Sequence, residues 1–96
     1  MNKVFLQYWE ESERGFGTRP DGASLYIDDN AHKIYLEKIY KNRDFNNIPH
    51  EYDRTVGIPI HVEVVDDLFN IILEKKILRL WQTELSNLIK LKSIIL

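Results

Sequence analysis

The chain has 96 residues, of which 44% are hydrophobic and 29% charged, and this size accommodates one domain with a modest core. It contains no cysteine, which excludes a disulfide scaffold, thiolate metal ligation and a thiol nucleophile. Thirteen Lys and Arg against fifteen Asp and Glu give a net charge of −2, so the composition argues against binding to duplex DNA driven by overall charge.

No apolar run is long enough to span a membrane, and the first residues lack the apolar stretch and cleavage site of a signal peptide. We therefore expect a single domain over residues 1–96, located in the cytoplasm, without membrane contact and without sequence-specific DNA binding.

The first predicted strand covers residues 3–9, which are rich in aromatic and branched side chains. A long loop over residues 10–22 follows, and its Pro20-Asp21-Gly22 segment predicts a turn. A second short strand covers residues 24–27. The two strands are expected to pair antiparallel.

A helix is predicted over residues 32–41, capped by one of the Asp and Asn residues at 28–30. The polar connector over residues 43–57 is long for a small domain, and such loops often carry function. Strict alternation then predicts a strand over residues 58–65, with Pro59 placing its start at a sheet edge or a first strand position.

Asp66 is the predicted N-cap of a helix over residues 67–76. Two interpretations remain beyond it, because no Gly or Pro interrupts the rest of the chain. One helix could continue from 67 to 96, or residues 77–81 could form a strand followed by a last helix that begins at Thr83. We favour the strand, because a helix of that length is unusual in a domain of this size.

Together these elements predict an α+β domain, in which a small antiparallel sheet of three or four strands is packed by two or three helices. The expected order is β-β-α-β-α-(β)-α. The tail over residues 85–96 is rich in Leu and Ile, which suggests that it docks on the sheet or forms a subunit interface. We expect a homo-oligomer.

The loop after the first strand contains two arginines, Arg14 and Arg19, around Gly15-Phe16-Gly17. Glycine lets backbone N–H groups approach a ligand, and arginine offers a forked donor to phosphate or carboxylate. Phe16 could stack on a base. The spacing matches neither a P-loop nor a dinucleotide fingerprint. The alternative is a structural loop in which the arginines pair with acidic residues of the same stretch.

The connector over residues 43–57 supplies two further arginines and Tyr52 as a stacking wall. If both loops project from the same end of the sheet, four guanidinium groups would surround one anionic ligand. The alternative is an ordinary solvated loop. The candidate ligand-binding residues are Arg14, Gly15, Phe16, Gly17, Arg19, Arg43, Tyr52 and Arg54.

No catalytic set is evident. The three histidines lack metal-ligand spacing and lie in three different elements, and no Ser, His and Asp form a recognisable triad framework. Paired carboxylates occur, but two of the pairs sit where helix caps belong. We therefore expect no catalytic residue, no metal and no cofactor.

Residues 8–25 contain Trp-Glu-Glu-Ser-Glu-Arg-Gly-Phe-Gly-Thr-Arg-Pro-Asp-Gly-Ala-Ser-Leu. This run resembles a Trp-Glu-x-Ser-Glu-Arg-Gly-x-Gly-x-Arg-Pro-Asp-Gly-x-Ser-Leu core shared by small phage- and prophage-encoded proteins. Residues 49–52 and 62–64 are also similar to that family. The resemblance implies an anti-defence protein in the host cytoplasm, which either sequesters a nucleotide signal or occludes a host protein.

The leading hypothesis is a non-enzymatic protein that sequesters an anionic, nucleotide-like ligand through the two Arg-bearing loops. The alternative is an inhibitor that occludes a host defence or nucleic-acid-processing complex. A phosphodiester hydrolase that depends on His50 or Glu51 is the third choice.

Overall fold

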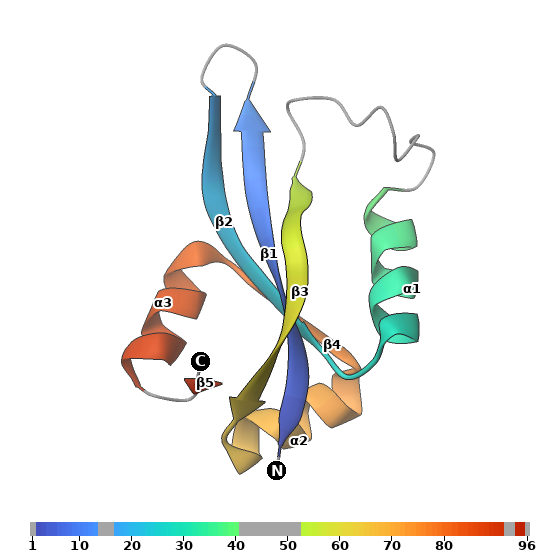
Figure 1. Cartoon of the computed structure of the whole chain (residues 1–96), viewed down its shortest axis with the longest axis vertical. Coiled ribbons are helices and arrows are strands. Elements are labelled where there is room, and N and C mark those ends of the chain that lie inside the picture. Colours follow the sequence, from blue (N-terminus) through green and yellow to red (C-terminus); the bar gives the residue numbers. More distant parts are fainter. Residues whose placement is uncertain (1, 14–16, 41–52, 92–93, 96) are drawn as a thin grey trace.

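A computed structural model of the chain describes residues 2–13, 17–40, 53–91 and 94–95. Figure 1 shows three helices arranged around one sheet. The elements are β1 (Lys3–Glu13), β2 (Gly17–Tyr26), α1 (Asp29–Ile39), β3 (Arg54–Val64), α2 (Asp66–Lys75), β4 (Ile77–Leu80), α3 (Gln82–Lys90) and β5 (Ile94–Ile95).

The strands form one antiparallel sheet in the order β4-β2-β1-β3-β5, with β1 at its centre. The predicted α+β class, the order of the elements and the antiparallel pairing of the first two strands are confirmed. The two-residue β5 is an additional strand, which pairs only with Glu63 and Val64 of β3.

The long loop predicted over residues 10–22 is wrong, because β1 and β2 continue through most of it as the arms of a hairpin. Pro20-Asp21-Gly22 is a bulge rather than a turn, since Asp21 and Gly22 together oppose Trp9. The bulge requires glycine at Gly22, whose φ is +89° and where an added Cβ would lie 1.9 Å from the Leu80 carbonyl oxygen.

Strand β3 begins at Arg54 and not at the predicted Ile58, because its pairing with β1 continues on the other side of a second bulge. Residues 57–59 together oppose the single residue Gln7 of β1. The Gln7 side chain is buried and donates from Nε2 to the Val56 carbonyl oxygen at 2.8 Å. The buried amide thus satisfies a backbone carbonyl that the bulge removes from the ladder.

After β3, the strand interpretation is confirmed and the continuous helix over residues 67–96 is wrong. Helix α2 ends at Lys76, which adopts a φ of +70° and directs the chain into β4. The predicted N-cap is also wrong: Val65 occupies the cap, and Asp66 is the first residue of α2. By contrast, Asp28 does cap α1, since its Oδ1 accepts from the Ala31 N–H at 2.8 Å.

The two faces of the sheet have different coverings. Helices α2 and α3 pack against the face that carries Val4 and Leu6, which we call the α2–α3 face, and this contact forms the core. Helix α1 lies against the other face, the α1 face, where its Tyr35 meets Trp9 edge to face. The buried apolar residues of the core cluster are Val4, Leu6, Ala23, Leu25, Val62, Val64, Leu68, Ile72, Leu80, Leu85 and Ile94.

Residues 85–96 were predicted either to dock on the sheet or to form a subunit interface. Leu85 and Ile94 of this tail are buried in the core, so this part of the tail docks on the sheet. None of the helices in the described ranges is long and apolar enough to cross a bilayer.

Candidate functional site

Of the eight residues predicted to bind a ligand, the structure describes Gly17, Arg19 and Arg54. Gly17 is the first residue of β2 and has a φ of +77°. A Cβ added at this position would have no other atom within 4 Å. The other five predictions, Arg14, Gly15, Phe16, Arg43 and Tyr52, lie outside the described residues.

The two described arginines do not converge. Arg19 donates through Nε and Nη2 to Glu11 Oε2, at 2.9 and 2.7 Å. Arg54 donates through Nε to Glu10 Oε1 at 2.6 Å. Successive residues of a strand point to opposite faces, so the Glu11–Arg19 pair lies on the α1 face and the Glu10–Arg54 pair on the α2–α3 face.

The Arg19 pair matches the alternative in which an arginine of the first loop binds an acidic residue of the same stretch. Arg54 of the connector instead pairs with Glu10 of β1, which neither interpretation of the connector included. The structure therefore gives no support, among the described residues, to one pocket shared by Arg19 and Arg54.

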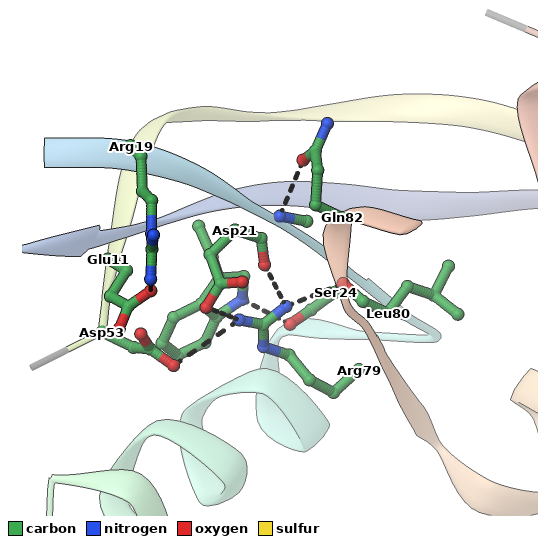
Figure 2. A network of polar contacts seen from close by, with 10 residues as sticks. Glu11, Arg19, Asp21, Ser24, Asp53, Arg79, Leu80 and Gln82 are labelled. Carbon is green, nitrogen blue, oxygen red and sulfur yellow. Dashed lines mark hydrogen bonds and ion pairs between the residues drawn. The ribbon is translucent and has the colours of Figure 1, made fainter. Parts of the chain in front are cut away.

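A third arginine, which the sequence analysis did not single out, lies at the centre of a polar cluster on the α1 face (Figure 2). The Arg79 side chain is only 10% exposed. Its Nη1 donates to the carbonyl oxygens of Asp21 and Leu80, at 2.8 Å each. Its Nη2 lies 3.5 Å from Asp21 Oδ2 and 3.7 Å from Asp53 Oδ2.

Aromatic rings complete the surroundings of this guanidinium. Its Cζ lies 4.7 Å from the centroid of the Trp9 ring and 4.2 Å from that of Trp81. The Trp9 indole is itself held in place, because Nε1 donates to Ser24 Oγ at 2.6 Å. Contacts of this kind between a cation and an aromatic face are strengthened by burial.

One guanidinium must offset two carboxylates in this cluster. Burial raises the pKa of Asp53, and the neighbouring Asp21 charge raises it further, while Arg79 partly opposes both effects. A hydrogen bond between the two carboxyl groups also favours the protonated form. The Arg79 cluster thus joins β2, β4 and the start of β3 through internal partners, which is the arrangement of a structural clamp.

A separate group of cations borders a cleft of about 410 Å³ between α1 and the junction of α2 with β4. Lys38 comes from α1, Lys75 from the last turn of α2, and Lys76 from the residue that ends this helix. The lining residues are Asp28, Asn30, Ala31, Ile34, Tyr35, Lys38, Lys75, Lys76 and Ile77. We call this site the lysine cleft.

The wall of the lysine cleft follows from helical periodicity. Ala31, Ile34, Tyr35 and Lys38 lie on one side of α1, at the i, i+3, i+4, i+7 spacing that places residues on one stripe. Ile77 of β4 faces them. The cleft therefore combines an apolar wall with ammonium groups from two separate elements.

The charges of the lysine cleft are unbalanced. Three lysines line it together with a single carboxylate, Asp28, which already accepts the N-cap hydrogen bond. Among the described residues, no carboxylate lies within ion-pair distance of Lys38, Lys75 or Lys76. An anionic group entering the cleft would therefore meet cations that the described part of the protein does not neutralise.

Tyr35 connects the two regions. It lines the lysine cleft and also packs edge-on against Trp9, with ring centroids 6.1 Å apart. Burial raises the pKa of the Tyr35 hydroxyl, and the charge of Arg79 partly opposes this shift. The phenol therefore stays neutral at physiological pH and offers a hydrogen-bond donor beside the cleft.

The two described histidines, His32 and His61, each lie against an aromatic ring. His32 stacks on Tyr26 with centroids 4.1 Å apart, and burial lowers its pKa. His61 packs on Phe5 at 4.4 Å. His50 lies outside the described residues. Within those residues, no group of three or more His, Asp or Glu is arranged to hold a metal ion.

Sequence reasoning missed both regions for identifiable reasons. Arg79 alternates with Leu78 and Leu80 in a short strand, and an arginine in such a setting must find a buried partner. Lys38, Lys75 and Lys76 lie at or just after the ends of two helices, where cations suit the helix dipole and are not by themselves a sign of a binding site. Only the packing of α1 beside the end of α2 brings these lysines to one cleft.

Comparison with protein-family models, with curated proteins and with solved structures finds no match to this chain. The function is therefore argued from the geometry of its own residues.

Proposed function

We propose that this protein is a non-enzymatic binding protein that captures an anionic, nucleotide-like ligand in the lysine cleft. The observation that carries the proposal is the convergence of Lys38, Lys75 and Lys76 on one hollow with an apolar wall. The ligand class is the one expected from the sequence, but the residues differ from the two Arg-bearing loops.

The chemistry of the lining favours a ligand with two unlike parts. Ammonium groups act as compact point charges and bind phosphate oxygens well, whereas the planar fork of arginine is suited to bidentate contacts. The apolar side of the cleft, formed by Ile34, Tyr35 and Ile77, would contact an aromatic or aliphatic body. A mononucleotide has both parts and a size that suits a cleft of about 410 Å³.

Capture without turnover is supported by the identity of the polar lining. Asp28, the carboxylate in the lining of the cleft, already accepts a hydrogen bond as the α1 N-cap, which leaves it poorly placed to act as a general base. Sequestration of a nucleotide signal is also one of the two activities implied by the resemblance of residues 8–25 to small phage proteins, the other being occlusion of a host protein.

Calorimetric titration of the full chain tests this proposal. The titrants are AMP, cyclic AMP, GTP, inorganic phosphate and the uncharged nucleoside adenosine. At least one nucleotide should bind, its affinity should fall as salt is raised, and adenosine should bind at least about tenfold more weakly because it lacks the charge.

A variant within the cleft and a control variant outside it assign the binding to the cleft. The double variant Lys75→Gln, Lys76→Gln should weaken binding about 10- to 100-fold, as expected for losing two charge-assisted contacts. Lys33→Gln removes a charge from the same helix α1 but outside the lining, and it should leave the affinity unchanged. Absence of binding by every nucleotide, or equal losses in both variants, would refute the proposal.

A further inference from the structure

The α2–α3 face is covered by helices over only part of its length. Beyond the core, four large apolar side chains stay between 39% and 44% exposed, three of them on neighbouring strands and one on α3. They are Tyr8, Val56, Ile60 and Ile89. A grouped set of exposed apolar residues of this kind marks an interaction surface.

The same region contains a hollow of about 410 Å³ between the strands and α3. Most of its wall is apolar, supplied by Tyr8, Pro20, Val56, Leu85 and Ile89. This hollow is separate from the lysine cleft, since it lies on the other face of the sheet and shares no lining residue with it.

Two residues beyond Val56, which lines the hollow, the bulge of β3 carries Ile58, which is 86% exposed. The bulge is held from beneath by Gln7, whose side chain is 3% exposed and donates to the Val56 and Gly57 carbonyl oxygens at 2.8 and 3.4 Å. A buried amide thus holds the backbone that projects an isoleucine into solvent. Fixing an apolar anchor in advance lowers the entropic cost of binding.

The outer edge of this strand segment resists pairing with another strand. Pro59 has no N–H to donate, and Gly57 adopts a φ of +78° within the bulge. A partner would therefore pack against side chains and would not extend the sheet by backbone hydrogen bonds.

Charge also favours contact between like surfaces. The charged residues of this region are Glu10, Arg19 and Arg54. Glu10 and Arg54 are joined by a 2.6 Å ion pair, and Arg19, which also lines the hollow, is paired with Glu11 at 2.7 Å. Two copies of the surface can therefore face each other without bringing unpaired like charges together, and the net charge of −2 adds little repulsion.

We propose that this surface binds a second copy of the chain in a two-fold dimer, in which Ile58 of each protomer enters the hollow of the other. One surface carries both the projecting side chain and the socket, which is the requirement for an isologous interface. The dimer interface is therefore on the sheet and includes Ile89 from α3, whereas Leu85 and Ile94 of the same tail are buried in the protein's own core.

Sedimentation of the full chain over a range of concentrations tests the dimer. The wild-type protein should dimerise, and both Ile58→Asp and Ile89→Lys should weaken association at least about 30-fold, as loss of an anchor or its socket does. Leu73→Asp alters an exposed leucine of α2 outside this surface and should not change association. Circular dichroism confirms that each variant is folded.

Mixing the two variants gives the decisive result. A protomer with Ile58→Asp and one with Ile89→Lys would form one unchanged contact and one Asp–Lys contact, so the mixture should dimerise where each variant alone does not. A wild-type chain that stays monomeric, or one that associates only with a different protein, would overturn the proposal. A dimer insensitive to both variants, or a mixture without recovery, would overturn it as well.

Discussion

The protein places cations in two neighbouring regions of the α1 face and treats them differently. In the Arg79 cluster, the guanidinium is enclosed by two carboxylates, two carbonyl oxygens and two indole rings. In the lysine cleft, three ammonium groups face a hollow with one carboxylate that is already engaged. A cation whose partners are internal contributes to stability, whereas cations without internal partners are available to a ligand.

The largest expected effect comes from removing the enclosed cation. Arg79→Leu leaves Asp21 and Asp53 half-buried without their counter-charge, and it should lower the free energy of unfolding by about 3–5 kcal/mol. Urea denaturation followed by circular dichroism measures this loss.

Arg19→Leu is the matched control, because Arg19 also pairs with a carboxylate but its side chain is 67% exposed. It should cost less than about 1 kcal/mol. Equal losses in the two variants would contradict the distinction between an enclosed and an exposed arginine.

A smaller effect of opposite sign is expected at the lysine cleft. Lys76 holds a φ of +70°, which is unfavourable for any residue with a Cβ. Lys76→Gly should therefore raise the free energy of unfolding by about 0.5–1 kcal/mol while weakening nucleotide binding about tenfold. Thermal denaturation and calorimetric titration of the same preparation measure the two quantities.

Lys75→Gly provides the contrast, since Lys75 lies within the last turn of α2. It should weaken binding similarly but lower stability by about 0.5–1 kcal/mol. Stabilisation by both glycines, or by neither, would show that backbone strain at Lys76 is not the cause.

The smallest effect concerns the carboxyl pair and its dependence on pH. Because the pKa of Asp53 is raised in the folded protein, the folded state binds more protons than the unfolded chain just above the ordinary pKa of Asp. Stability therefore falls as the pH rises from the ordinary value of 3.8 through the raised pKa.

Asp53→Asn keeps a hydrogen-bonding group and removes the second charge. It should flatten this decline and raise the free energy of unfolding at pH 7 by about 0.5 kcal/mol. Urea midpoints measured from pH 4 to 7 check the slope, and Asp67→Asn, an exposed residue of α2, should retain the wild-type slope. An unchanged slope in Asp53→Asn would contradict the paired-carboxyl interpretation.

The order of elements could be predicted from the sequence because each core strand keeps its apolar alternation and α1 has a side-chain cap. The hairpin arms could not be predicted, since β1 beyond Trp9 and the first half of β2 consist largely of polar residues. Such strands show no apolar period, and their Glu, Arg and Gly residues are typical of loops. The two bulges could not be predicted either, because a bulge depends on the register between two strands, which no local sequence pattern gives.

The candidate site was harder to predict than the fold. Arg19 and Arg54 were predicted to surround one anionic ligand, but strand alternation places them on opposite faces, each beside a glutamate of β1. The lysines of the cleft come from residues about 37 positions apart in the chain, and no local pattern joins them. Spatial convergence of this kind follows from tertiary packing.

The stacking of Trp9, Arg79 and Trp81 has a practical consequence. These are the two tryptophans of the chain, so its tryptophan fluorescence comes entirely from rings that contact a single guanidinium. The intensity and wavelength of this emission should therefore change if β4 separates from the β1–β2 hairpin. Tyr35 packs against Trp9 and also lines the cleft, so a ligand that displaces the Tyr35 ring is expected to change the Trp9 emission without an attached dye.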